Sequence, residues 1–235
     1  MPKRVVFVLG EPEYQSHVTM PTIAEELEDR GEIRASVCIS SHIPDAPDFP
    51  ESHFPGLEAL GDADLAVFYT RFRVLPDDQM RIIAAYLDSG RPVVGLRTST
   101  HSFRFPEGSP WRSWNDGFGR DVLGTPWISH HGGQSSTQVT KLPGAEGHPI
   151  LEGVEDRLHV RSWLYKVLPL PEDCEQLLWG TPVGAEREVQ ENPVAWTRTH
   201  SGGRVFYTSL GHPDDLAVPS VRTLVMNGIR WGLGW

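Results

Sequence analysis

Residues 92–101 have the sequence PVVGLRTSTH, in which apolar and small residues give way at once to polar ones. The first half is typical of a short buried strand. Ligands of open α/β sheets collect beyond the carboxyl ends of the strands, so Arg97 and His101 stand where a site is expected. A strand that simply ends in a cation and a hydroxyl cap would have the same sequence.

The segments before this stretch alternate between strands and helices. Continuous apolar runs predict strands at 4–10, 35–39 and 63–69, and helical periodicity predicts helices at 20–30 and 76–89. This order is typical of a doubly wound sheet. The predicted fold class is therefore α/β with a mostly parallel central sheet.

After residue 103 the pattern loosens into shorter elements. The predicted strands are 136–141, 157–165, 175–179, 193–198 and 204–209, and the predicted helices are 115–123 and 219–231. The chain has no repeat, low-complexity tract or linker, so residues 1–235 are predicted to form a single domain.

Composition excludes several classes of function. The formal net charge is -10 and the basic residues are scattered, which argues against nucleic acid and anionic membranes as partners. No apolar run is long enough to span a membrane, and the chain enters a strand at once, so we expect a cytoplasmic protein without a signal peptide. Cys38 and Cys174 are too far apart in sequence to indicate a disulfide framework or a thiolate metal cluster.

Four histidines stand at strand ends or in loops, where parallel strands would bring them to one rim: His101, His130, His131 and His212. Such a group can bind a divalent metal or act as general acid and base. His130 and His131 are adjacent and lack the spacing of paired zinc ligands, so no metal is predicted and the cofactor stays open. Each histidine taken singly can also be a hydrogen-bonded structural residue.

Two further features indicate a site for a small molecule. His212 is followed by Pro213 and Asp214, and the acid could orient the imidazole, although Pro and Asp also form simple turns. Trp111 and Trp127 flank the loop histidines and could form sugar platforms or pack in the core. The chain has no Walker loop, Rossmann glycine fingerprint or Gly-x-Ser-x-Gly elbow.

These pieces together resemble the trehalose-utilisation (ThuA-like) family of the class I glutamine amidotransferase-like superfamily. The likeness runs in order through nearly the whole chain and is carried by residues 94–101, 130–134, 147–150, 193–198 and 202–212. It implies a flavodoxin-like three-layer sandwich. It also implies a role in the catabolism of trehalose or of oxidised (3-keto) glycosides.

Two positions depart from the related families. Arg97 stands where glutamine amidotransferases carry their nucleophilic cysteine, and a guanidinium stays protonated and cannot attack a carbonyl, which excludes glutaminase activity. ThuA-like proteins typically carry histidine at the position of Arg97, the turn after the strand. Of their Asp-Glu-x-Tyr motif only Tyr165 carries over, because residues 162–165 are Ser-Trp-Leu-Tyr.

Three hypotheses follow. In the first, the protein is an enzyme acting on a carbohydrate: Arg97 holds an oxygen of the substrate, and His212, oriented by Asp214, transfers a proton. The residues predicted to bind the substrate are His101, His130, His131, Trp111, Trp127 and Tyr165. In the second, the protein binds a sugar without catalysis or has a regulatory role. In the third, it is a structural protomer whose aromatic surface serves homo-oligomerisation.

Overall fold

The computed structural model describes residues 2–42, 50–185 and 188–235. Its main element is a nine-stranded sheet with strand order β2-β1-β3-β4-β11-β10-β9-β6-β7. The parallel part consists of β2 (Ile33–Ile39), β1 (Lys3–Gly10), β3 (Leu65–Thr70), β4 (Val93–Leu96) and β11 (Gly203–Thr208). The antiparallel extension consists of β10 (Asn192–His200), β9 (Glu175–Val183), β6 (Ser136–Lys141) and β7 (Arg157–Val160).

The sheet is thus mixed, and the expected mostly parallel arrangement holds only for its first five strands. The physical reason is the length of the later connections. A parallel pair needs a long crossover, whereas the two-residue turn between β10 and β11 can join only antiparallel strands. The C-terminal half therefore folds back as hairpins.

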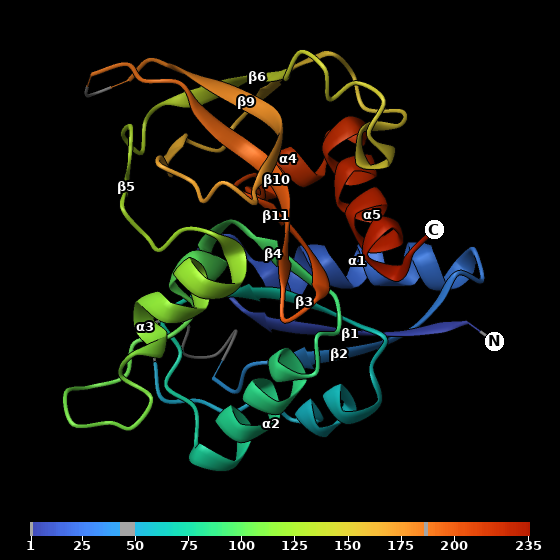
Figure 1. The fold of residues 1–235 in the computed structure, drawn as a ribbon, viewed down its shortest axis with the longest axis vertical. Helices are drawn as coiled ribbons and strands as arrows, with labels where there is room; N and C mark the ends of the chain where they lie inside the picture. The colour runs from blue at the N-terminus through green and yellow to red at the C-terminus, as the bar shows by residue number, and fades with distance from the viewer. Residues whose placement is uncertain (1, 43–49, 186–187) are drawn as a thin grey trace.

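Helices cover both faces of the parallel part, as Figure 1 shows. The helices α1 (Ser16–Asp29) and α5 (Pro219–Leu233) lie on one face, and α2 (Asp77–Asp88) with the short helix η1 (Leu57–Asp62) lies on the other. Alternate residues of β1 enter the two cores: Phe7 joins the α1 and α5 residues, while Val8 joins those of α2. A strand buried on both faces needs a continuous apolar run, which is the sequence of β1. The result is a three-layer α/β arrangement.

Short elements connect these layers. They are η2 (Arg97–His101), α3 (Trp114–Gly117), the π-helical turn η3 (Phe118–Leu123), η4 (Pro149–Leu151), α4 (Pro213–Leu216), and a separate two-stranded sheet of β5 (Ser129–His130) and β8 (Tyr165–Lys166). Within the described ranges, no helix has the length and apolar character needed to cross a membrane.

The strand predicted at 157–165 is divided into β7 and β8, which belong to different sheets. The cause is the buried carboxylate of Asp215. It accepts hydrogen bonds from the backbone N–H groups of Arg161 at 2.7 Å and Ser162 at 3.0 Å. Those groups are then not available to a sheet ladder, so the chain leaves the main sheet at this point.

Candidate functional site

The site is organised by the turn that follows β4. Arg97 is the first residue of η2 and has a φ of 41°, in the left-handed region that side chains other than glycine rarely adopt. Two hydrogen bonds with neighbouring strands hold the turn. The Tyr207 hydroxyl donates to the Arg97 carbonyl at 2.6 Å, and the Ser99 hydroxyl donates to the Phe68 carbonyl at 2.7 Å. The strained position is thus fixed by the sheet around it.

The Arg97 side chain is fully buried in a cage of aromatic rings. Its guanidinium carbon lies 4.3 Å from the ring centroid of Tyr14, 4.7 Å from that of Tyr165 and 4.9 Å from that of Trp163. Nη1 donates to the carbonyl of Ser209 at 2.8 Å, and Nη2 donates to the Tyr14 hydroxyl at 3.2 Å. Among the described residues, no carboxylate forms an ion pair with this cation, so the π faces supply its main electrostatic compensation.

A cavity of about 170 Å³ lies on the other side of these rings. It stands over the carboxyl ends of β1, β3 and β4, and the small β5–β8 sheet contributes one wall. Its lining residues are Glu13, Tyr14, Arg71, Phe72, Thr98, His101, Trp127, His130, Trp163 and Tyr165. Arg97 is not among them, because the aromatic cage separates it from the cavity. The cavity thus combines aromatic walls with a small number of polar groups, as small-molecule sites do.

His101 is a buried but cavity-lining imidazole, with 6% of its surface exposed. Its ring centroid lies 4.7 Å from that of Trp127 and 5.0 Å from that of Phe72, and its Nδ1 is 3.1 Å from the Thr100 hydroxyl. Burial, reinforced by the charges of Arg71 and Arg97, lowers the pKa of His101 to about 3. The ring is therefore neutral at physiological pH, and its second nitrogen is a hydrogen-bond group of low basicity.

A pair of acids stands at the end of β1, next to Arg71. The Arg71 Nη1 lies 2.6 Å from the Glu13 carboxylate at the cavity and 4.0 Å from Oε1 of Glu11. Glu11 is fully buried and accepts a hydrogen bond from the Tyr14 backbone N–H, but its Oε1 has no hydrogen-bond partner among the described residues. Burial raises the pKa of Glu11 to about 7. This carboxyl group therefore changes charge near neutral pH.

The cavity brings together four of the residues predicted from the sequence, namely His101, His130, Trp127 and Tyr165. His131 is not in the lining: it is fully buried, and its Nδ1 lies 3.1 Å from the carbonyl of Glu188. Trp111 is placed elsewhere, with its indole N–H donating to Asp77 at the start of α2 at 2.9 Å. The predicted cluster of loop residues is thus only partly assembled.

His212 and Asp214 lie behind the cage and outside the cavity lining. His212 is the N-cap of α4: its Nδ1 accepts from the Asp214 backbone N–H at 3.1 Å, and its ring lies 6.0 Å from that of Tyr14. Burial lowers the pKa of His212. The Asp214 carboxylate lies 3.5 Å from Nδ1 of His212, with its side chain 74% exposed. The buried acid of this segment is Asp215, which accepts hydrogen bonds from backbone N–H groups. In this arrangement His212 and Asp215 hold the loop together.

Sequence reasoning missed the residues that come from the ends of β1 and β3, including Glu13, Tyr14 and Arg71. The signal was present, because both segments follow predicted strands just as Arg97 does. In the described part of the chain, no group of three or more His, Cys, Asp or Glu side chains is arranged to hold a metal ion.

Comparisons with known proteins agree with this architecture. The family model for ThuA, described as trehalose utilisation, matches residues 4–232. A crystal structure described as ThuA-like, from Parabacteroides merdae, superposes with a TM-score of 0.70 at 15% identity and covers 99% of this chain and 90% of its own. A second ThuA-like structure, from Bacteroides uniformis, has a TM-score of 0.66 at 16% identity, covering 98% of this chain and 91% of its own.

A cytoplasmic protein of Salmonella typhimurium LT2 has a TM-score of 0.60 at 12% identity, covering 97% of this chain and 98% of its own. A search of curated proteins gave no significant match. At these identities the solved structures show a shared fold, and the family match extends over nearly the whole sequence. The chain therefore belongs to the ThuA family, described as trehalose utilisation.

Proposed function

We propose that this flavodoxin-like protein acts in the cytoplasm in the catabolism of trehalose or a 3-keto-glycoside, and that it binds the sugar in the aromatic cavity. The observation that carries the proposal is the composition of the cavity wall. Trp127, Trp163 and Tyr165 offer ring faces for the C–H faces of a sugar, while Glu13 and Arg71 offer an acceptor and donors for its hydroxyl groups. The family description supports the same substrate class.

The chemistry that fits these groups is proton transfer beside a ketone. His101 lines the cavity, and its free nitrogen could carry a proton between carbons next to a keto group once the negative charge that develops on the substrate raises the pKa of this ring above its low value in the free protein. The enolate oxygen formed in that step would be stabilised by the positive charges of Arg71 at the cavity and Arg97 behind the rings. In this proposal Arg97 acts through its field, since the cage separates it from the substrate.

A second function, sugar binding without catalysis, is favoured by the absence of a nucleophile at the elbow. Arg97 cannot attack a substrate, and burial raises the pKa of both Cys38 and Cys174 to about 11, which keeps these thiols protonated. Neither cysteine lines the cavity. A protein that kept the fold and lost the covalent chemistry would have these features.

One experiment separates the two functions. The purified protein is titrated with trehalose and with 3-keto-glucosides by calorimetry, and loss of substrate is then followed over time. Turnover that His101→Gln abolishes while binding persists supports the enzyme. Saturable binding that needs Trp127 but gives no turnover supports the binding protein. If neither class of sugar binds, both functions are wrong.

A further inference from the structure

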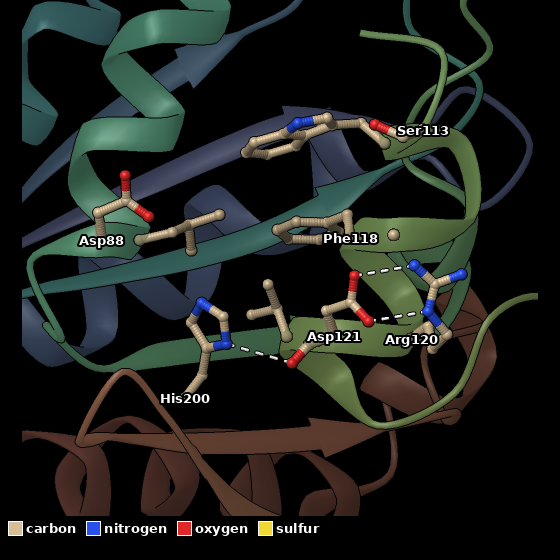
Figure 2. Close-up of a pocket in the computed structure, with 10 residues that line it drawn as sticks. Asp88, Ser113, Phe118, Arg120, Asp121 and His200 are labelled. Atoms are coloured by element: carbon tan, nitrogen blue, oxygen red, sulfur yellow. Dashed lines mark hydrogen bonds and ion pairs between the residues drawn. The ribbon is translucent and has the colours of Figure 1, made fainter.

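A second cavity, of about 220 Å³, lies on the α2 side of the sheet and shares no lining residue with the first. It is formed by the end of α2, by α3 with the π-helical turn η3, and by the end of β10. Its lining residues are Leu87, Asp88, Ser113, Trp114, Gly117, Phe118, Arg120, Asp121, Val122 and His200. In Figure 2, Asp88 and His200 approach the cavity from one side, and Phe118 and Asp121 approach it from the other.

The polar groups of this cavity are already partly paired, and the pairing decides what remains for a ligand. Arg120 donates through Nε and Nη2 to the Asp121 carboxylate at 2.8 and 2.9 Å, so these two charges cancel (Figure 2). His200 Nδ1 lies 3.1 Å from the carbonyl oxygen of Asp121, to which it can only donate. With Nδ1 directed at this carbonyl, Nε2 is the ring nitrogen left for a ligand.

Asp88 adds an uncompensated negative charge. It forms no ion pair with any described residue. It is also the last residue of α2, where the helix dipole is negative and cations are favoured. Asp88, an exposed residue at the mouth, and His200 thus offer hydrogen-bond acceptors that suit a donor with positive charge.

The remaining walls are apolar. Leu87, Phe118 and Val122 are buried side chains, and Trp114 is a partly buried ring packed against the same core. The faces of aromatic rings attract cations, most strongly that of tryptophan. One wall is a π-helical turn, a rare element that is often found at functional sites.

We propose that this cavity is a second small-molecule site and that it binds an organic ammonium ion. The amine would donate to Asp88 and His200, and the apolar body of the ligand would lie against Trp114 and Phe118. Neither the charge preference nor the position depends on the sugar site, so the two proposals can fail separately.

The test titrates the protein (residues 1–235) with 2-phenylethylammonium and with its neutral isostere 2-phenylethanol, by calorimetry. The ammonium ion should bind and the alcohol should bind at least about five-fold more weakly. Asp88→Asn should weaken binding of the ammonium ion about five-fold, whereas Asp78→Asn, a change of an exposed acid in the first turn of the same helix, should leave it unchanged.

A variant whose side chain fills the second cavity gives an independent test of where the ammonium ion binds. Ser113 is exposed at the rim, so Ser113→Trp should fold normally by circular dichroism and block the cavity. Equal binding of alcohol and ammonium ion, or retained binding in Ser113→Trp, would overturn the proposal. Loss of ammonium binding in Trp127→Ala would also overturn it, because the ligand would then lie in the first cavity.

Discussion

The guanidinium of Arg97 lies 4.3 Å from the ring of Tyr14 and donates to the hydroxyl group of that same residue. Tyr14 is also part of the cavity wall, so one ring contacts the buried cation on one side and borders the cavity on the other. Arg97 therefore shapes the cavity without entering it. Its contribution to stability and its contribution to binding can be measured separately.

Arg97→Ala should lower the free energy of unfolding by about 3 kcal/mol, because it leaves a cavity among three rings and removes the donor to the Ser209 carbonyl. Arg97→Met fills most of the space and removes a buried charge, so it should cost only about 1 kcal/mol. Urea denaturation of the purified variants measures both values. Equal losses would mean that the charge, and not the filling of space, stabilises this turn.

The strands and helices could be predicted from the sequence because their signals are local. The apolar run of β1 is enough to predict a buried strand, and the periodic apolar residues of α5 are enough to predict a helix with one buried face. The division of residues 157–165 could not be predicted, because its cause, Asp215, lies more than fifty residues further along the chain. Local pattern contains no information about such a long-range hydrogen bond.

The site was predictable to a similar degree. His101 follows β4 and Trp127 precedes β5. Their rings meet because these strand ends lie at the same edge of the fold. Trp111 and His131 also lie in loops, but neither lines the cavity. The Trp111 indole donates to Asp77, and the His131 ring lies against the Glu188 carbonyl. Residue type and loop position therefore identified the region, and pairwise contacts decided which side chains reached it.

His101 should make the protein sensitive to acid. Its pKa falls from the usual 6.5 to about 3 on folding, so between these values the unfolded chain binds a proton that the folded protein does not. Its contribution to stability is therefore complete above pH 6.5 and is lost as the pH falls toward 3. His101→Gln should show a shallower loss of stability over this range in urea titrations at successive pH values. An unchanged slope would show that the folded ring is protonated.

Glu11 should have the opposite effect. Its pKa rises from the usual 4.5 to about 7, so the folded protein holds a proton that the unfolded chain releases between these values. Stability due to this group is present below pH 4.5 and is lost as the pH rises through 7. Glu11→Gln keeps an acceptor for the Tyr14 backbone N–H and should be more stable than the wild type at pH 8. Equal stability at pH 8 together with equal pH slopes would contradict this assignment.

Trp127 and Trp111, both predicted from the sequence to bind the substrate, should differ in their effect on the affinity for the sugar. Trp127 lines the cavity, with its ring centroid 4.7 Å from that of Tyr165, so Trp127→Ala should weaken binding of the sugar about ten-fold or more. Trp111→Ala removes a ring whose indole binds Asp77, and it should leave the affinity unchanged. Calorimetric titration of both variants with the same sugar is the measurement. Similar losses in the two variants would show that the cavity is not the binding site.

Thr98 offers the sharpest test of the cavity, because it is a lining residue whose buried hydroxyl has no hydrogen-bond partner among the described residues. A desolvated hydroxyl that gains nothing in the free protein is explained if a ligand supplies its partner. Thr98→Val keeps the shape and removes the hydroxyl. It should leave the free energy of unfolding equal or raise it by up to about 1 kcal/mol, and it should weaken sugar binding about ten-fold.

Thr98→Ser is the matched variant, since it keeps the hydroxyl and removes a buried methyl group. It should retain the affinity for the sugar and lose about 1 kcal/mol of stability. Thr98→Val should thus weaken binding without a loss of stability, and Thr98→Ser should lower stability without weakening binding. A general disturbance of the turn after β4 would lower both quantities in both variants. If Thr98→Val binds the sugar as the wild type does, the hydroxyl does not contact the ligand, and the sugar lies elsewhere or closer to the β5–β8 wall.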